Sequence, residues 1–345
     1  MNIPISLRKA TAFISLIGIA LLSVLIAVNS RDIVPEKYFY DSASIDSLKR
    51  SAEVLEIGNS YNNTALFYQL LGINENSALN SLLFPAIFIT AIFYILRRLE
   101  TKNLLGTTAI CFYACITAAI YLSQYSKESI VLLLCLGFLA SCHSLRLLTI
   151  WVAAAAVYAI YFRAYWLITL SLFIVNLLIL KKYNKPTLFL ATAFLLYLLL
   201  ALLLPIIYGQ ELGQHRINSN GDRIGSIDAL TLITPTIPGS GWLLDTINTF
   251  LQLLLLLFPV PLAFTGNILH LTSFIALSLI SCIALIKLKQ QHKSGALRNS
   301  PKLRSGYSLL FSALSVQAIF EPDYGSYIKH LTPLLTILMF TYNQK

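Results

Sequence analysis

Charged side chains are scarce in this sequence. They make up 12% of its 345 residues, whereas soluble domains carry roughly 25%. Hydrophobic residues account for 57%, and the mean hydropathy is +0.73. The composition therefore excludes a soluble protein and predicts an all-α polytopic integral membrane protein in the lipid bilayer.

Several short motifs are also missing. The sequence contains no G-x-x-x-x-G-K-S/T and no G-x-G-x-x-G, and no internal repeat, so we expect no bound nucleotide. The five cysteines lie inside apolar runs, as small core residues do. We therefore predict no disulfide and no metal site. These cysteines are Cys111, Cys115, Cys135, Cys142 and Cys282.

Ten apolar runs approach the length of a membrane span. They occupy residues 11–29, 79–96, 104–122, 129–145, 147–162, 165–180, 187–208, 267–287, 306–320 and 330–342. Several are shorter than the about 20 residues that a bilayer requires, so we expect their boundaries to shift. The first run lacks an A-x-A cleavage pattern, which favours a retained span over a signal peptide.

The charges orient these spans. With both termini in the cytoplasm, 16 of the 25 basic residues lie inside, whereas 14 of the 15 acids lie outside, with Glu100 the exception. This distribution follows the positive-inside rule. The net charge of +10 therefore reflects topology and not nucleic-acid binding.

The run Ile247–Phe264 does not fit this alternation. If it crossed the membrane as an eleventh span, the basic cluster from Lys287 to Arg304 would move outside. We predict a re-entrant or interfacial helix that ends near Pro259 and Pro261. The chain is then a single transmembrane domain (1–345) with two long periplasmic loops, 30–77 and 209–265, and such loops usually carry function.

Short outer connections also hold charge. Lys127 and Glu128 lie in SQYSKES, where the alternative role is to cap a turn. Arg163 lies in YFRAYW, and a charge at that depth needs water, a partner or an anionic ligand. The alternative for Arg163 is an interfacial position among the belt aromatics Tyr161, Tyr165 and Trp166.

The large loop contains His215, Arg216 and Arg223 among Asn, Gly and Ser. Arginine presents a planar set of donors that matches phosphate oxygens, and histidine can transfer protons near neutral pH. His215 can equally be a solvated loop residue. The sequence does not decide between these interpretations.

The stretch EPDYGSYIKH places Glu321 and Asp323 directly after one span and Lys329 and His330 at the start of the next. Pro322 and Gly325 favour a turn, which would bring acids and bases together. In the first loop, Asp41 and Asp46 follow an aromatic cluster. A salt-bridged turn in the first case, and helix capping by Asp41 or Ser44 in the second, are the structural alternatives.

Four motifs together resemble those of bacterial surface-polysaccharide repeat-unit polymerases, the Wzy-type proteins of O-antigen and capsule clusters. They are P-E-K-Y-F-Y-D-S in the first loop, S-K-E before a middle span, F-R-A-Y-W one hairpin later, and E-P-D-Y-G-S-Y-I-K-H-L-T-P-L-L. The resemblance extends from about Pro35 to Leu335. Lys329 departs from the pattern, because arginine is more usual there and lysine lacks bidentate geometry.

The resemblance implies a GT-C-like or O-antigen-ligase-like helical fold in the bacterial inner membrane, without a metal or cofactor. It implies transfer of a glycan from undecaprenyl diphosphate to a second lipid-linked repeat unit at the periplasmic face. The product would be O-antigen, capsule or exopolysaccharide. Besides the lipid-linked donor and acceptor, the flippase and the chain-length regulator of the same pathway are expected partners.

That reaction needs a base and cations at the departing diphosphate. The candidate bases are His215, Glu321 and Asp323, followed by Glu128 and Asp41. The candidate ligands of the diphosphate or the sugars are Arg163, Arg216, Arg223, Lys127, Lys329, His330, Tyr165, Trp166 and Tyr324.

Two other functions stay open. A GT-C glycosyltransferase that uses a polyprenyl-phosphate sugar would take its base from the first outer loop, where Asp41 and Asp46 lie. A flippase of lipid-linked oligosaccharide would place charges along its spans, near the middle of the membrane. Few ionisable residues occupy such positions here, which disfavours the flippase.

Overall fold

The computed structural model describes residues 5–74, 77–97, 104–221 and 230–344. These residues form helices and connections without a β-strand; only an isolated bridge joins Leu232 to Asp323. The prediction of an all-α protein is therefore confirmed. The helices, in order, are α1 (Ile5–Val28), α2 (Ser30–Ile33), η1 (Glu36–Phe39), α3 (Tyr40–Leu48), α4 (Ser60–Leu70), α5 (Ala78–Leu96), α6 (Leu104–Tyr121), α7 (Lys127–Ser141), α8 (Leu145–Tyr161), α9 (Tyr165–Tyr183), α10 (Leu188–Tyr208), α11 (Gln214–Gly221), α12 (Trp242–Leu257), η4 (Val260–Phe264), α13 (Ile268–Lys293), α14 (Ala296–Asn299), α15 (Pro301–Phe320) and α16 (Tyr324–Asn343).

Four helices, α5, α9, α10 and α13, are long and apolar enough to cross a membrane. Shorter apolar stretches lie at Phe13–Val28, Leu105–Tyr121, Leu145–Tyr161 and Trp242–Leu257. These helices agree with a multi-pass membrane protein. The expected total of ten spans stays a prediction.

The shortest apolar runs belong to longer helices. The runs 306–320 and 330–342 extend at their N-terminal ends into α15 and α16, which have 20 residues each. Ser300 caps α15 by accepting a hydrogen bond from the backbone N–H of Leu303, and Pro301 occupies its first turn. The polar first turns explain why hydropathy alone underestimated both lengths.

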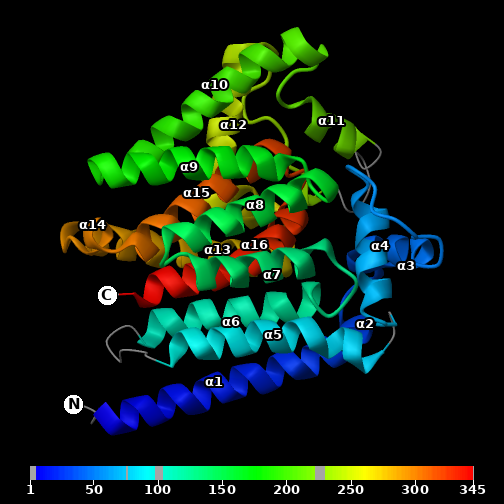
Figure 1. The fold of residues 1–345 in the computed structure, drawn as a ribbon, viewed down its shortest axis with the longest axis vertical. Coiled ribbons are helices and arrows are strands. Elements are labelled where there is room, and N and C mark those ends of the chain that lie inside the picture. Colours follow the sequence, from blue (N-terminus) through cyan, green and yellow to red (C-terminus); the bar gives the residue numbers. More distant parts are fainter. Residues whose placement is uncertain (1–4, 75–76, 98–103, 222–229, 345) are drawn as a thin grey trace. The chain divides into compact units, whose positions relative to one another are not determined.

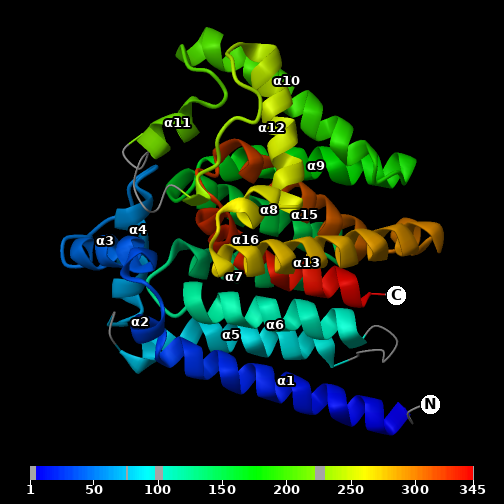
Figure 2. The same cartoon turned by 180° about the vertical axis from the view of Figure 1, so that it is seen from behind.

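The chain divides into two compact units. Unit 1 comprises Met1–Leu167 and Lys329–Lys345, and unit 2 comprises Ile168–Ile328. In unit 1, α1 packs against α5 and α6. Figures 1 and 2 show these three helices side by side, with α3 and α4 at the end of the unit that is opposite to both chain termini.

The first outer loop is a folded cap on unit 1. Its helices α3 and α4 pack against each other. The Ser42 hydroxyl accepts a hydrogen bond from the backbone N–H of Tyr125 at 3.1 Å, and Asn63 donates to the carbonyl of Tyr161 at 2.6 Å. The loop is thereby attached to the α6–α7 connection and to the end of α8.

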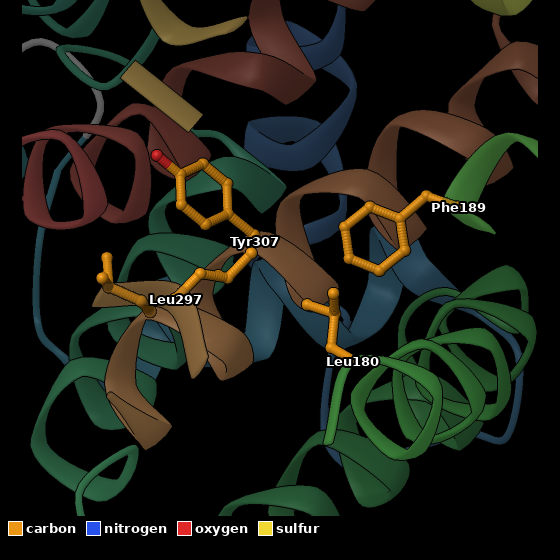
Figure 3. Close-up of a cluster of buried hydrophobic side chains, with 5 residues drawn as sticks. Leu180, Phe189, Leu297 and Tyr307 are labelled. Carbon is orange, nitrogen blue, oxygen red and sulfur yellow. The ribbon is translucent and has the colours of Figure 1, made fainter. Parts of the chain in front are cut away.

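In unit 2, an apolar cluster joins the end of α9, the start of α10, α14 and the start of α15. Figure 3 shows Leu180, Phe189, Leu297 and Tyr307 of this cluster. The basic residues beside it in the sequence are therefore brought to one end of the unit. They are Lys181, Lys182, Arg298, Lys302 and Arg304, all of which charge patterning assigned to the cytoplasmic side.

The segment 247–264 is divided between α12 and η4. Helix α12 ends at Leu257, two residues before Pro259, and Val260–Phe264 forms a 3₁₀ turn with Pro261 near its start. The predicted end of the helix near the prolines is confirmed, because proline removes a backbone donor and cannot continue an α-helix. Whether the segment crosses the membrane stays a prediction.

Candidate functional site

Six charged or titratable side chains from four distant parts of the sequence meet in unit 1. Asp41 comes from α3, Arg163 from the connection between α8 and α9, and two pairs come from the first turn of α7 and from α16. All six are among the candidates predicted from the sequence. We call this set the charged cluster: Asp41, Lys127, Glu128, Arg163, Lys329 and His330.

Glu128 lies at the centre of the charged cluster and is fully buried. Its Oε1 accepts from Arg163 Nη2 at 2.5 Å and lies 3.2 Å from His330 Nε2. Its Oε2 lies 3.8 Å from Lys329 Nζ and accepts a hydrogen bond from the Ser126 hydroxyl. A buried carboxylate requires such partners to offset the loss of its hydration. Glu128 therefore holds the side chains of Arg163, Lys329 and His330 together.

The local fold presents Glu128 at the start of α7. Ser126 is the N-cap residue, and its hydroxyl accepts from the backbone N–H of Glu128 at 3.2 Å. The hydroxyl of Tyr68, in turn, accepts from the backbone N–H of Ser126 at 3.0 Å. An acidic residue in the first turn of a helix also interacts favourably with the helix dipole.

Asp41 is the second carboxylate of the charged cluster, and 38% of its side chain is exposed. It forms an ion pair with Lys329 and accepts a hydrogen bond from the Tyr61 hydroxyl at 2.5 Å. Burial by itself would raise the pKa of Asp41, but Lys329 and the Tyr61 hydroxyl hold it well below its usual value. Asp41 is therefore a carboxylate anion at neutral pH.

Lys127, the remaining cation of the charged cluster, lies over the ring of Tyr61. Its Nζ lies 3.3 Å from the centroid of the Tyr61 ring, a cation–π contact, and the side chain is buried. Burial and the neighbouring Asp41 carboxylate raise the pKa of Tyr61 above its usual value, so its hydroxyl keeps its proton. Tyr61 thus donates to Asp41 while its ring faces Lys127.

The charges of the cluster do not cancel. Lys127, Arg163 and Lys329 are cations, whereas Asp41 and Glu128 are anions, so the charged cluster is positive even with His330 neutral. Burial by itself would lower the pKa of Arg163, but the carboxylate of Glu128 outweighs it and holds that pKa well above its usual value. This arrangement can bind an anion and has a partly exposed carboxylate beside it.

The predicted residues of unit 2 have different partners. Arg216, in α11, is buried and donates to the backbone carbonyls of Ala318, Ile319 and Glu321, with Nε 3.0 Å from the Glu321 oxygen. These carbonyls lie at the C-terminal end of α15. Arg216 therefore caps that helix end, where unpaired carbonyls require donors.

Asp323 and Glu321 are also buried. Asp323 Oδ1 accepts from the backbone N–H of Ser326 at 2.9 Å, and its Oδ2 accepts from the Ser326 hydroxyl at 3.0 Å. Asp323 is thus the N-cap of α16. The predicted turn is confined to residues 321–323, because Gly325 already belongs to α16. The carboxylate of Glu321 acts electrostatically on Arg216.

The remaining candidates are placed as follows. His215 is exposed on α11, and its ring makes an edge contact with Phe320, 5.9 Å between centroids. Trp166 and Tyr324 are buried, so their rings face protein instead of solvent. Tyr165 accepts a hydrogen bond from Arg163 Nη1 at 3.0 Å. Arg223 lies outside the described residues.

One structural alternative raised by the sequence is wrong. The N-cap position of α3 is Phe39, so neither Asp41 nor Ser44 caps that helix. Arg163 contacts the aromatic Tyr165, as its second interpretation expected, and is also paired with Glu128.

Sequence reasoning missed Tyr61 and Ser126. The S-K-E pattern before an apolar run is a helix-start signal that would have found Ser126. Nothing in the sequence around Tyr61 distinguishes it from the other tyrosines.

Among the described residues, no group of three or more His, Cys, Asp or Glu side chains is arranged to hold a metal ion. No family model, curated protein or solved structure matches the chain. The function is therefore inferred from the residues of the charged cluster.

Proposed function

We propose that this protein is a Wzy-type polymerase that joins lipid-linked oligosaccharide repeat units at the periplasmic face of the bacterial inner membrane. The charged cluster is the observation that carries the proposal. It combines three cations, a buried carboxylate that organises them, and a partly exposed carboxylate. All six of its residues come from the four motifs that resemble this family.

In the proposed reaction, an acceptor hydroxyl oxygen forms a bond to the anomeric carbon of the donor glycan. The bond from that carbon to the phosphate oxygen breaks, and undecaprenyl diphosphate leaves with the electron pair. Arg163, Lys127 and Lys329 stabilise the negative charge that develops on the diphosphate. Arginine donates in pairs to phosphate oxygens, whereas each lysine acts as a point charge.

We assign the base to Asp41. It is the partly exposed carboxylate of the charged cluster, whereas Glu128 is fully buried and engaged by its partners. When the diphosphate draws Lys329 away, the pKa of Asp41 rises towards its ordinary value, and the carboxylate becomes a stronger base for the acceptor hydroxyl. Glu128 is then a positioning residue for Arg163 and His330.

The test is the length of the product in cells that make the substrate. Arg163→Ala should leave single repeat units on their lipid anchor, with polymer reduced about 100-fold, because a preorganised charge at the leaving group is lost. Arg163→Lys keeps a charge beside Glu128 but loses the paired donors, so an intermediate chain length is expected.

The matched control is Arg146→Ala, because Arg146 is exposed at the opposite end of α8. All variants are compared at equal amounts of folded protein, measured by size-exclusion chromatography of a fluorescent fusion. Normal long chains in Arg163→Ala would remove this residue from the mechanism.

The position of Asp41 also favours a second candidate, a GT-C glycosyltransferase that uses a polyprenyl-phosphate sugar and takes its base from the first outer loop. The two functions differ in their donor. The purified protein is incubated with a lipid-diphosphate repeat unit or with a polyprenyl-monophosphate sugar. Consumption of the monophosphate donor, and not of the diphosphate, would replace the polymerase with this glycosyltransferase.

A further inference from the structure

The segment that precedes α4 exposes three aliphatic side chains. Val54, Leu55 and Ile57 are 65%, 54% and 77% exposed. The segment is neither helix nor strand; Glu53 precedes the aliphatic residues, and Glu56 lies between Leu55 and Ile57. Apolar side chains that gather on a surface in this way usually mark a contact with a partner or with lipid.

The backbone of this segment is held firmly by buried amides. Asn62 donates to the carbonyl of Val54 at 3.0 Å. The side chain of Asn63 accepts from the backbone N–H of Glu56 at 2.8 Å and donates to the carbonyl of Glu56 at 2.6 Å. The carboxylate of Glu56 accepts from Asn59 at 2.7 Å. The exposed aliphatic side chains are therefore presented from a fixed backbone.

The same segment is attached to the end of α8. The backbone N–H of Gly58 donates to the carbonyl of Ile160 at 3.1 Å, and Asn63 reaches the carbonyl of Tyr161. The exposed face of α8 is apolar and includes Ile150, Val157 and Ile160, which share a helix face by their spacing. The apolar run 147–162 predicts that this helix spans the membrane. Its lipid-facing surface would then continue into the segment.

We propose that Val54, Leu55 and Ile57 insert into the outer boundary of the bilayer beside α8, so that the first loop is held on the lipid surface. Two further features favour lipid over a second copy of the chain. Three side chains present far less area than the about 800 Å² per partner of a stable interface. Glu53 and Glu56, which alternate with the aliphatic residues, would supply polar groups at headgroup level, the arrangement of an interfacial anchor.

The contact would also fix the depth of the charged cluster. Helix α4 begins at Ser60, three residues after Ile57, and its Tyr61 touches both Asp41 and Lys127. A lipid-anchored segment thus holds this side of the charged cluster near the headgroups. The inference does not depend on the reaction proposed above.

The test places an environment-sensitive NBD dye at residue 57. The starting variant is Cys282→Ser, because Cys282 is exposed whereas the other four cysteines are buried. Ile57→Cys is labelled in this background and reconstituted into phosphatidylcholine–phosphatidylglycerol vesicles. The matched control is Asp46→Cys, an exposed position on α3. Residues 46 and 57 belong to the same loop, so in each vesicle both dyes lie on the same side of the membrane.

At residue 57 we expect emission shifted to shorter wavelength, strong quenching by doxyl-labelled lipid and weak quenching by iodide. At residue 46 we expect the reverse order. Iodide quenching at residue 57 equal to that at residue 46 would overturn the proposal. So would protection from both quenchers, which would indicate a second copy of the chain. If Ile57→Cys fails to fold, Leu55→Cys provides the same readout.

Discussion

Arg163 is largely buried and Arg216 is buried, and both lie at helix ends, yet their partners differ. Arg163 is paired with the carboxylate of Glu128, whereas Arg216 donates to backbone carbonyls at the end of α15. Burial acts to lower the pKa of both. It lowers the pKa of Arg216 to about 10, but the Glu128 carboxylate reverses the effect at Arg163. Arg163 belongs to unit 1 and Arg216 to unit 2, and the partners of each lie within its own unit.

The difference shows that burial of an arginine does not by itself identify a ligand-binding cation. The group with which the arginine is paired distinguishes a ligand-binding role from a structural one. An arginine whose donors are directed at the carbonyls of a helix end satisfies groups that would otherwise be unpaired, which is a structural role. An arginine within a group of mixed charges, beside a partly exposed carboxylate, can exchange its partner for an anionic ligand.

The largest effect on stability is expected from Glu128→Gln. It leaves Arg163, Lys329 and His330 without their central carboxylate, and breaking a buried ion pair costs about 3–5 kcal/mol. The loss is measured as a lower thermal unfolding midpoint in detergent. Glu36→Gln, at an exposed position of the same unit, is the control. Equal midpoints for the two variants would contradict the central role of Glu128.

A smaller loss is expected from Arg216→Ala. It removes the donors to the C-terminal carbonyls of α15, at about 1.5–3 kcal/mol for hydrogen bonds from a charged group. The amount of folded protein should fall, while the product made per folded molecule stays unchanged. A collapse to single repeat units at unchanged stability would instead restore Arg216 to the ligand-binding role that its sequence context suggested.

The smallest effect is expected from Asp41→Asn, and it should depend on pH. Because the folded-state pKa of Asp41 is depressed, its contribution to stability is fully present above the ordinary value of 3.8 and is lost as pH falls below it. Unfolding midpoints of the two proteins should therefore differ at pH 7 and draw progressively closer as the pH falls below 3.8. A constant difference across this range would exclude the Asp41–Lys329 pair as its source.

Much of the fold could be predicted from local sequence. The apolar runs located the helices, and the prolines at 259 and 261 located the end of α12. The lengths of α15 and α16 were underestimated, because their first turns are polar and hydropathy does not register them. In the first loop a helix was expected only as an alternative, after Asp41 or Ser44, and α4 was missed, since α3 and α4 are mostly polar and are stabilised by packing against each other.

The candidate site was predicted residue by residue but not as an arrangement. Lys127, Glu128, Arg163, Lys329 and His330 were identified because charges at the ends of apolar runs are unusual and costly. Their partners were not, and Asp323 and Arg216 were ranked as chemical groups although both cap helices. Capping depends on which backbone groups a fold leaves unpaired, and the sequence does not list them.

The sequence by itself determined that this is a helical membrane protein whose polar side chains gather at the ends of its apolar segments. Hydropathy and charge act locally, so they can be evaluated along the chain. Only the tertiary structure decided which charges neutralise one another. Asp41 and Lys329 are 288 residues apart, and Glu128 and Arg163 are 35 apart. Such pairs exist only after the helices pack, because Coulomb attraction and desolvation depend on distance in space.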